Sequence, residues 1–416
     1  MAGETQRVVF VSSSVGRGGG AERSLFHLIK AVGAAGFQSR LITPADGIVP
    51  ARIASEGVPC EVEYWSTMPP QLRTREGALP RRIGSIVANS HRAGLAGLRL
   101  GREARRKRVD LIHCNNLMPN MLGAIAGIVG NVPVIWHARD IHTRLPRRFA
   151  DRLLASHPSV RRIVCVSQAT ARQYLHTAPR KLRVVYNGID PAEWARSAVR
   201  PTLRDEIPEL RDRFIVGCHG RFVPWKGYEL VITAIRELAD RFPEIALVLV
   251  GDVSPGIPHE RKYKQGLERL INRLGLQKHV YMVGYRSDVR PYLADFDVYV
   301  APSVGPDPFP RSVLEAMCLG LPIVGSRSGG IPEALGPNAA TAGLLFPVAD
   351  GAALTRALAR LRQSPGLRQQ LGEAALQAVR EHFTLERYCR SMVNVFREVL
   401  SSPGAGRARR AGQADR

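Results

Sequence analysis

Two basic residues in the second half of the chain have the types and the spacing to bind a diphosphate group. Arg221 and Lys226 stand five positions apart in a loop that follows a short apolar run ending at Gly217. An arginine can donate two parallel hydrogen bonds to phosphate oxygens, and a lysine adds a compact positive charge. Lys226 is one of only seven lysines among 59 basic residues, which makes its position here more telling. The alternative is an exposed charge pair on a surface loop.

Two carboxylates further along the chain could bind hydroxyl groups. Asp307 lies in a loop after the apolar residues 298–301, and Glu315 lies eight positions later in a helix that Pro310 is suited to open. The loop carboxylate could bind sugar hydroxyls and the helical one ribose hydroxyls, while the amides at the helix N-terminus face phosphate. As alternatives, Asp307 is a turn residue and Glu315 a solvated helix residue. The apolar neighbours of Glu315 instead predict partial burial, and a buried carboxylate needs partners.

A glycine-rich loop in the first half follows the apolar residues 8–11. Residues 16–21 match the pattern G-x-G-x-x-A, which lets a ligand approach the backbone at a helix N-terminus. The pattern alone also fits NAD binding or a flexible surface turn. Two features disfavour NAD: the loop is longer than the tight dinucleotide turn, and the second strand ends at Thr43-Pro44 with no acid immediately there, although Asp46 is close.

These residues are placed by a pattern in which short β-branched runs alternate with helical segments, and the pattern occurs twice. We expect strands at residues 7–11, 40–42, 111–113, 132–136, 162–165 and 181–185, then at 214–217, 246–250, 280–283, 298–301 and 322–325. We expect helices at 20–35, 120–130, 169–176, 228–241, 263–274, 311–318 and 352–361. Such alternation predicts an α/β protein with two parallel, doubly wound sheets.

A polar stretch with three prolines, residues 190–212, marks the domain break. The predicted organisation is an N-terminal Rossmann-like domain at residues 1–190, a C-terminal Rossmann-like domain at 191–380, a final helix at 381–400 and a disordered basic tail at 401–416. The length of 416 residues suits two domains of this size.

The composition is strongly basic, with a formal net charge of +23. Such a charge attracts polyanions, although Arg-rich codon usage is an equal alternative. The six cysteines are widely spaced and several lie in apolar runs, which predicts buried free thiols in a reducing compartment. We find no signal-peptide pattern and no apolar run long enough to span a membrane, so we expect a cytoplasmic protein.

A basic stretch at residues 71–108 carries eleven Arg and Lys residues against Glu76 and Glu103, a net charge of +9. Its interspersed leucines and isoleucines predict an amphipathic helix that could bind an anionic membrane surface from the cytoplasmic side. The alternative is a solvated face of a helix packed on the N-terminal sheet. The stretch contains no aromatic residue on which bases could stack, so nucleic acid is not an expected partner.

We expect no metal site. Asp295-Phe296-Asp297 resembles a metal-binding Asp-x-Asp motif, but it directly precedes an expected strand, where aspartates are common in turns. His113, His142 and His219 have no carboxylates at ligand spacing and are interpreted as structural.

Taken together, these motifs resemble the retaining glycosyltransferases of family 4, which have the GT-B fold: two Rossmann-like domains facing a central cleft. The resemblance covers the chain from the glycine loop to about residue 400, and its markers occur in the family's order. They are residues 18–23, 136–140, 166–167, 186–190, 220–221 with 226–227, 307–315, 319–324 and 329–333.

The resemblance implies a role for each matching residue. Arg221 and Lys226 would hold the diphosphate of a nucleotide-sugar donor, Glu315 the nucleotide ribose, and Asp307 the donor sugar. His137 would lie beside the reacting sugar, so that the catalytic set is His137, Arg221, Lys226 and Asp307. The remaining donor-binding residues would be Gly19, Gly20, Asn187, Phe309, Arg311, Gly329 and Gly330.

The implied activity is transfer of a hexose from a UDP- or GDP-sugar to a glycan or lipid-linked acceptor, with retention at the anomeric carbon and no bound metal or other cofactor. The family's carboxylate pair is usually two glutamates, whereas here the first is Asp307, and Pro310 stands where glycine is common. Both departures fall at the donor sugar. The alternatives are a non-catalytic nucleotide-sugar binder of the same fold and, through the glycine loop, an NAD-dependent oxidoreductase.

Overall fold

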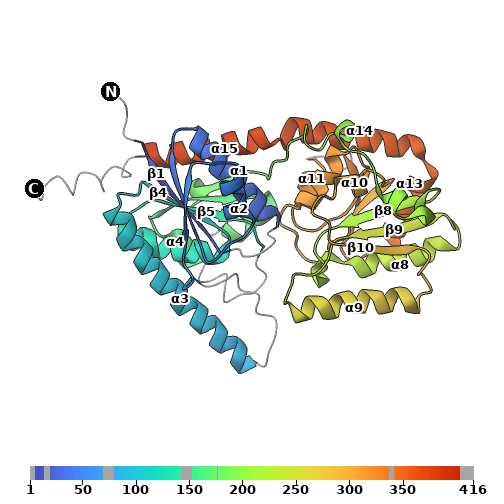
Figure 1. Cartoon of the computed structure of the whole chain (residues 1–416), viewed down its shortest axis with the longest axis horizontal. Coiled ribbons are helices and arrows are strands. Elements are labelled where there is room, and N and C mark those ends of the chain that lie inside the picture. The colour runs from blue at the N-terminus through green and yellow to red at the C-terminus, as the bar shows by residue number, and fades with distance from the viewer. Residues whose placement is uncertain are drawn as a thin grey trace, which may run out of the picture. The chain divides into compact units, whose positions relative to one another are not determined.

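The structure is a computed structural model that describes residues 5–13, 19–68, 79–141, 152–175, 177–336 and 342–402, with side chains in the basic stretch described from residue 88 onward. The chain divides into two compact units. Unit 1 comprises Met1–Gly188 and Leu385–Arg416, and unit 2 comprises Ile189–Thr384. Each unit is built around its own parallel sheet (Figure 1).

The described part of unit 1 contains a seven-stranded parallel sheet in the order β3-β2-β1-β4-β5-β6-β7. Its strands are β1 (Arg7–Ser12), β2 (Gln38–Thr43), β3 (Cys60–Tyr64), β4 (Leu111–Asn115), β5 (Val134–Ala138), β6 (Val160–Cys165) and β7 (Leu182–Val184). Along β1, Val9 and Val11 face one hydrophobic core while Val8 and Phe10 face another. Because both faces are buried, the central strands are almost continuously apolar, as expected of a parallel sheet.

Helices cover both faces of this sheet. The Phe10 face is covered by α1 (Gly20–Ala34), α2 (Ile48–Ser55) and α15 (Leu385–Ser401). The Val9 face is covered by α3 (Leu79–Arg106) and α4 (Leu117–Gly130), and α6 (Gln168–Ala171) follows β6. The final helix, α15, returns to unit 1 because Tyr388, Met392 and Phe396 recur at helical spacing and are buried against the core of α1 and β1.

The glycines of the basic stretch lie where α3 and α4 pack side by side (Figure 1). A Cβ atom on Gly101 would lie 2.7 Å from the Cβ of Val129 and 2.8 Å from the carbonyl oxygen of Ala126. A Cβ atom on Gly97 would meet Ile125 at 2.8 Å. These glycines therefore allow close helix packing rather than interrupting α3. Residues 71–78 of the basic stretch lie outside the described residues.

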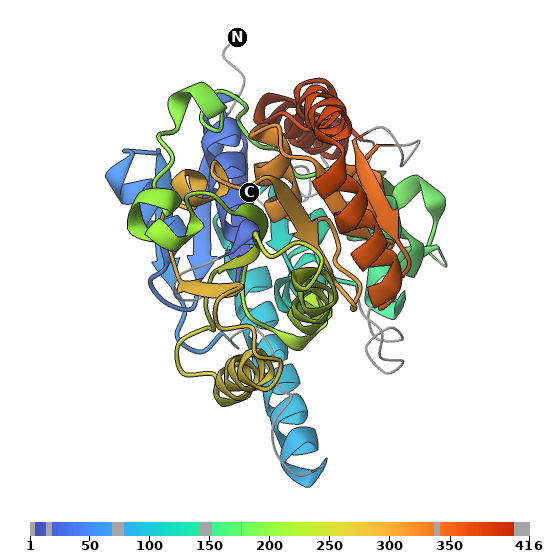
Figure 2. The ribbon, with the colours of Figure 1, turned by 90° about the vertical axis from the view of Figure 1, so that its right-hand side faces the viewer.

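Unit 2 repeats the architecture with a six-stranded parallel sheet, within its described residues, in the order β10-β9-β8-β11-β12-β13. Its strands are β8 (Phe214–His219), β9 (Ile245–Val250), β10 (Val280–Gly284), β11 (Val298–Ala301), β12 (Ile323–Ser326) and β13 (Gly343–Phe346). Its helices are α7 (Leu203–Glu206), α8 (Tyr228–Ala239), α9 (Pro258–Arg273), α10 (Arg290–Leu293), α11 (Arg311–Cys318), α12 (Ile331–Ala334), α13 (Gly351–Gln363) and α14 (Pro365–His382). The strand–helix alternation can be followed in Figures 1 and 2.

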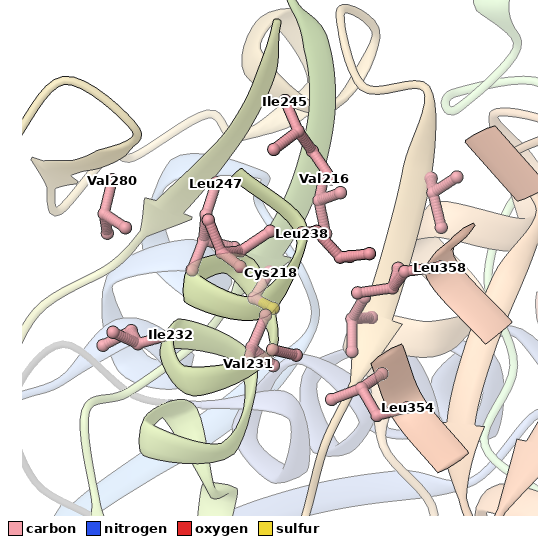
Figure 3. Packing of buried hydrophobic residues seen from close by; sticks show 14 of the residues in the cluster. Val216, Cys218, Val231, Ile232, Leu238, Ile245, Leu247, Val280, Leu354 and Leu358 are labelled. Atoms are coloured by element: carbon pink, nitrogen blue, oxygen red, sulfur yellow. The ribbon is translucent and has the colours of Figure 1, made fainter. Parts of the chain in front are cut away.

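One face of the unit 2 sheet forms a continuous hydrophobic core with α8 and α13. Val216 and Cys218 of β8 pack against Val231 of α8, and Leu354 and Leu358 reach the same cluster from α13 (Figure 3). The neighbouring residue Gly217 faces the other way, where a Cβ atom would overlap the ring of Phe296 at 1.9 Å. The alternation along β8 thus puts one face on α8 and the other on Phe296, which lies in the turn before β11.

The predicted fold class, two doubly wound α/β domains, is confirmed. The sequence analysis missed the strands β3 and β13 and the helices α2, α7, α10, α12 and α14. The sequence of β3, CEVEY, lacks an apolar run because this edge strand is only partly buried, and its two glutamates flank a single valine.

All six cysteines are unpaired, as predicted, and burial raises the pKa of the Cys60 thiol to about 12. The disordered tail was predicted at residues 401–416, but Ser401 is the last residue of α15, and residues 403–416 lie outside the described residues.

Candidate nucleotide-sugar site

In both sheets the strand order reverses once, between β1 and β4 in unit 1 and between β8 and β11 in unit 2. Ligands of doubly wound folds bind outside the carboxyl ends of the strands at this reversal point. In unit 2, the loops that leave β8 and β11 carry the predicted charged residues. Their geometry is therefore the starting point for the site.

Lys226, which is partly buried, forms an ion pair with the buried Asp307. The Nζ atom of Lys226 lies 2.7 Å from Oδ2 of Asp307, which also accepts a hydrogen bond of 3.2 Å from the hydroxyl of Ser303. An ammonium group has three N–H donors, so the contact with Asp307 leaves donors for other oxygens. The pair orients a positive charge at the end of β8.

The backbone of the two loops holds this pair in place. The amides of Val304 and Gly305 donate to the carbonyl of Trp225 at 2.9 and 3.0 Å. Gly227 has a positive φ of 72°, and a Cβ atom there would lie 2.4 Å from the carbonyl oxygen of Pro302. A side chain at position 227 would therefore separate the loop of Lys226 from the loop of Asp307.

Glu315 is held from two sides. Its Oε2 atom lies 2.7 Å from Nε2 of His219, the last residue of β8, and its Oε1 atom lies 3.8 Å from Nε of Arg311 in the first turn of α11. The side chains of all three are at least nine-tenths buried. Glu315 is thus buried and partnered, as its apolar sequence neighbours predict. His219, interpreted as structural, orients this carboxylate.

Arg221 lies apart from these pairs. Its guanidinium is half-exposed, and its ion-pair partner among the described residues is Glu260, whose Oε1 atom lies 3.8 Å away. Glu260 is itself buried and accepts a hydrogen bond of 2.7 Å from the amide of Ser254. Arg221 therefore shares the loop of Lys226 but not its ion pair, and its side chain retains donors for a ligand.

Gly329, Gly330 and Phe309 brace the loop of Asp307. The amide of Gly330 donates to the carbonyl of Asp307 at 2.8 Å, and a Cβ atom on Gly329 would lie 1.9 Å from that same oxygen. The Phe309 ring is buried against Phe383, with ring centroids 5.4 Å apart. In this arrangement the Gly330 amide is bonded to the Asp307 carbonyl, and the role of Gly330 in donor binding stays a prediction.

In unit 1, His137 is fully buried at the end of β5. Its Nδ1 atom lies 3.2 Å from Nε2 of His113 and 3.5 Å from NH2 of Arg139. Burial and the nearby Arg139 charge lower the pKa of His113 to about 3 and hold the pKa of His137 well below its ordinary value of 6.5. Both rings are therefore neutral at pH 7.

Asn187 belongs to the same buried network. Its Oδ1 atom accepts 2.8 and 3.4 Å hydrogen bonds from Arg139 and from the hydroxyl of Ser24 in α1. Gly19 and Gly20 begin that helix, and the Gly19 amide donates to the Glu22 carboxylate at 2.5 Å. Residues 14–18, the first part of the glycine loop, lie outside the described residues.

Sequence reasoning missed Arg139 as a separate site residue, together with His113, Asn115 and His219. Arg139 donates to Asn115, Asn187 and the hydroxyl of Tyr388, which are far apart in the sequence. Their positions in the sequence could have indicated them as site residues, because Asn115, Arg139 and His219 each follow an expected strand.

The Asp295-Phe296-Asp297 sequence has a structural role. Oδ2 of Asp297 accepts a 2.7 Å hydrogen bond from the amide of Ile215, and Asp295 accepts one of 3.2 Å from the amide of Arg204. The Asp297 carboxylate thus holds the start of β8, and the Asp295 carboxylate holds the start of α7. Among the described residues, no group of three His, Cys, Asp or Glu side chains could hold a metal ion. His142, interpreted as structural, lies outside those residues.

A doubly wound pair of units with a cationic loop and a partnered carboxylate at the sheet reversal defines a nucleotide-binding α/β protein. The family comparisons specify its class. The profile of Glycosyltransferase Family 4 matches residues 18–193, and that of Glycosyl transferases group 1 matches residues 199–378. The chain belongs to this glycosyltransferase family, and the resemblance predicted from the motifs is confirmed.

Two similar proteins are named as glycosyltransferases of lipopolysaccharide core biosynthesis. The lipopolysaccharide core biosynthesis glycosyltransferase LpsE of Rhizobium meliloti is 26% identical over 396 residues, which cover 93% of this chain and 97% of the relative. The lipopolysaccharide core biosynthesis mannosyltransferase LpcC of Rhizobium leguminosarum bv. viciae is 30% identical over 222 residues, 52% of this chain and 60% of the relative.

Solved structures share the fold. Anabaena HepE in complex with UDP-glucose has a TM-score of 0.76 at 23% identity, covering 94% of this chain and 99% of that one. WaaG, a glycosyltransferase involved in lipopolysaccharide biosynthesis, has a TM-score of 0.67 at 16% identity, covering 93% and 99%. Among the described residues of this chain, no helix has the length and apolar character needed to cross a membrane.

Proposed function

We propose that the protein is a retaining glycosyltransferase that moves a hexose from a UDP- or GDP-sugar to a glycan or lipid-linked acceptor in envelope polysaccharide synthesis. The observation that carries the proposal is that two ion pairs, the partly buried Lys226–Asp307 and the buried His219–Glu315, are both formed between residues at or after the carboxyl ends of β8 and β11, where the strand order reverses. The activities in the names of LpsE and LpcC, and the UDP-glucose held by HepE, support it.

In this proposal Lys226 and Arg221 stabilise the negative charge that grows on the departing diphosphate. A preorganised cation is effective because the protein has already oriented it before the bond breaks. Asp307 accepts hydrogen bonds from sugar hydroxyls while keeping the ammonium of Lys226 in place. Glu315, held by His219 and Arg311, accepts from the ribose hydroxyls. We further propose that no bound metal takes part.

Kinetics test the proposal directly. The wild-type protein should release UDP or GDP from a matching donor only when an acceptor is present. Lys226→Ala removes the oriented cation and should lower kcat/KM on the order of hundred-fold or more, and Glu315→Ala should do so through weaker nucleotide binding. Arg236→Ala, an exposed arginine paired with Asp240 on α8, is the matched control and should retain activity.

A non-catalytic binder of the same fold is the competing possibility. It predicts that UDP- or GDP-sugars bind and raise the melting temperature while no donor and acceptor pair gives turnover. Retention is tested separately, by the anomeric configuration of the product in its NMR spectrum. An inverted linkage would contradict that part of the proposal.

We also propose that the exposed face of α3 binds anionic lipid on the inner side of the cytoplasmic membrane. Leu95 is 54% exposed and lies beside the exposed Arg92, Arg99 and Arg102. Each basic residue near an anionic surface contributes about 1 kcal/mol. Co-sedimentation with phosphatidylglycerol vesicles should exceed that with phosphatidylcholine vesicles and fall in an Arg92→Gln/Arg102→Gln variant. Equal binding to both vesicles would contradict the proposal.

A further inference from the structure

Arg139 is a buried arginine with no carboxylate partner in the part of the chain that the structure describes. Its Nε atom donates to Asn115 at 2.7 Å, NH1 to Asn187 at 2.8 Å, and NH2 to the hydroxyl of Tyr388 at 3.0 Å. All three acceptors are neutral. The guanidinium is therefore oriented, but its charge is not balanced by these contacts.

Arg40 shows the usual solution for such a residue in the same unit. Arg40 and Arg139 are both 7% exposed. The guanidinium of Arg40 pairs with two carboxylates, those of Glu63 and Glu103. Burying an unpaired charge is costly, so a cation that is held by neutral groups alone is well suited to receive an anion from outside the chain.

The groups around Arg139 offer further hydrogen-bond donors. Within the described residues, Oγ of Ser13, Nδ2 of Asn115 and Nε2 of His137 are buried and have no hydrogen-bond partner. Strand register places them together, because Ser12 of β1 pairs with Asn115 of β4, and Asn115 pairs with His137 of β5. They therefore lie at the β1/β4 reversal of unit 1, the position at which unit 2 carries its charged pairs.

The tautomer of His137 follows from its neighbours. Both contacts of its Nδ1 atom are with nitrogens, and NH2 of Arg139 can only donate. Nδ1 of His137 is then the acceptor, and the proton of this neutral ring is on Nε2. Since Oδ1 of Asn115 is occupied by Arg139, its Nδ2 atom is likewise a donor. The side chains around the positively charged Arg139 therefore offer hydrogen-bond donors, and no carboxylate among the described residues is bonded to its guanidinium.

We propose that these groups form an oxyanion site in unit 1 that binds a phosphate or carboxylate group of the acceptor, with Arg139 as the cation and Ser13, Asn115 and His137 as additional donors. The site binds an anion whether or not the proposed function holds. Its assignment to the acceptor rests on that function, because unit 2 supplies the donor-binding charges. The acceptor is then a phosphorylated or acidic glycan rather than a neutral one.

The test measures anion binding without turnover. The parent protein for this test is the full-length chain with Arg221→Gln and Lys226→Gln, so that the two loop cations of unit 2 no longer attract phosphate. The glutamine at position 226 could still donate a hydrogen bond to Asp307. Titration calorimetry with inorganic phosphate should give saturable binding, and adding Arg139→Gln should weaken it about tenfold or more, since hydrogen bonds to charged groups are strong. Acetate in place of phosphate distinguishes a carboxylate-bearing acceptor from a phosphorylated one.

Two further variants keep the test decisive if Arg139→Gln folds poorly. Asn115→Asp is isosteric, keeps the acceptor for Nε of Arg139 and neutralises its charge, so the protein should fold and lose anion binding. Arg40→Gln, the equally buried control, should lower stability and leave phosphate affinity unchanged. Absence of saturable phosphate and acetate binding in the parent, or unchanged binding in Asn115→Asp, overturns the proposal. Because no donor sugar is used, this outcome is independent of the Lys226 and Glu315 kinetics.

Discussion

At the scale of single residues, the proposed donor site depends on acidic groups that are held by nitrogen donors. In the proposed function Glu315 can accept hydrogen bonds from ribose hydroxyls only if its carboxylate keeps its orientation, and Nε2 of His219 lies 2.7 Å from its Oε2 atom. His219 itself packs edge-on against Tyr299, with ring centroids 5.4 Å apart. We interpret His219 as a positioning residue for nucleotide binding.

A pair of substitutions tests this role. His219→Ala removes the donor and should weaken UDP or GDP binding about tenfold, since a hydrogen bond to a carboxylate contributes roughly 1.5–3 kcal/mol. His219→Gln places an amide near the position of Nε2 and should recover most of the affinity. Titration calorimetry measures both, and KM for the donor should rise more than kcat falls. Equal losses in the two variants would show that the ring acts only by filling space.

The two neutral histidines of unit 1 give the protein a specific dependence on pH. The unfolded chain binds a proton at His113 near pH 6.5, whereas the folded chain binds it only near pH 3. Stability from this residue is therefore present above pH 6.5 and is lost as the pH falls toward 3. Between pH 7 and pH 5 the loss is about 2 kcal/mol for His113 alone.

Chemical unfolding at pH 7 and pH 5 measures this effect. The His113→Gln variant cannot titrate and should show a smaller drop in unfolding free energy between the two pH values than the wild type. An identical pH dependence in wild type and His113→Gln would rule out this source.

At the scale of elements, the contact between α3 and α4 shows how glycine can support a helix pair. Gly97 and Gly101 lie against Ile125 and Val129, whereas a Cβ atom on Gly94, on the same helix, would meet nothing within 4 Å. The helix propensity of alanine over glycine is the same at each position, about 1 kcal/mol. Any difference between the sites must therefore come from packing.

Alanine substitutions separate the two contributions. Gly94→Ala should stabilise the protein by about 0.5–1 kcal/mol through helix propensity. Gly101→Ala places a methyl group against the backbone of Ala126 and should destabilise by about 1–3 kcal/mol. Thermal unfolding of the two variants measures the difference. A stabilising Gly101→Ala would mean that α3 moves away from α4 without cost.

The elements that could be predicted from sequence were those with a strong local pattern. The apolar runs at β1, β8 and β9 are buried on both faces and were found at nearly the observed bounds. The edge strand β3 was missed because one of its faces carries Glu61 and Glu63 in place of apolar residues, and Glu63 pairs with Arg40. A run of apolar residues in the sequence indicates a buried element, so strands and helices that are only partly buried are not predicted by it.

The sequence predicted which loops carry the residues of the candidate site, but it did not predict which of these residues contact one another. Lys226 and Asp307 are 81 residues apart, and their pairing depends on the adjacency of β8 and β11, which follows from the doubly wound order. The network of Arg139 needs four segments, including α15 near the end of the chain. A sequence pattern cannot specify which of several buried polar residues meet when each comes from a different segment.

At the scale of the whole molecule, the chain leaves unit 1, forms unit 2 and returns. Unit 1 is therefore discontinuous and depends on residues that follow unit 2 in the sequence. From α15, Tyr388, Met392 and Phe396 are buried in the core beside β1 and α1, and the Tyr388 hydroxyl accepts a hydrogen bond from Arg139. Unit 2, by contrast, is continuous and has its own core between β8, α8 and α13.

This arrangement predicts an asymmetric response to truncation. Removing residues 385–416 withdraws several large apolar side chains from the core of unit 1, each contributing about 1.5–3 kcal/mol, which together approach the whole stability of a domain. The fragment 1–384 should therefore show one cooperative thermal transition, from unit 2, with unit 1 unfolded at 25 °C. The fragment 189–384 should fold alone with the same transition temperature, because its core contains no residue from α15. Calorimetry of the full chain and both fragments decides the matter: an unchanged unit 1 transition in 1–384 would mean that α15 rests on a core already complete without it.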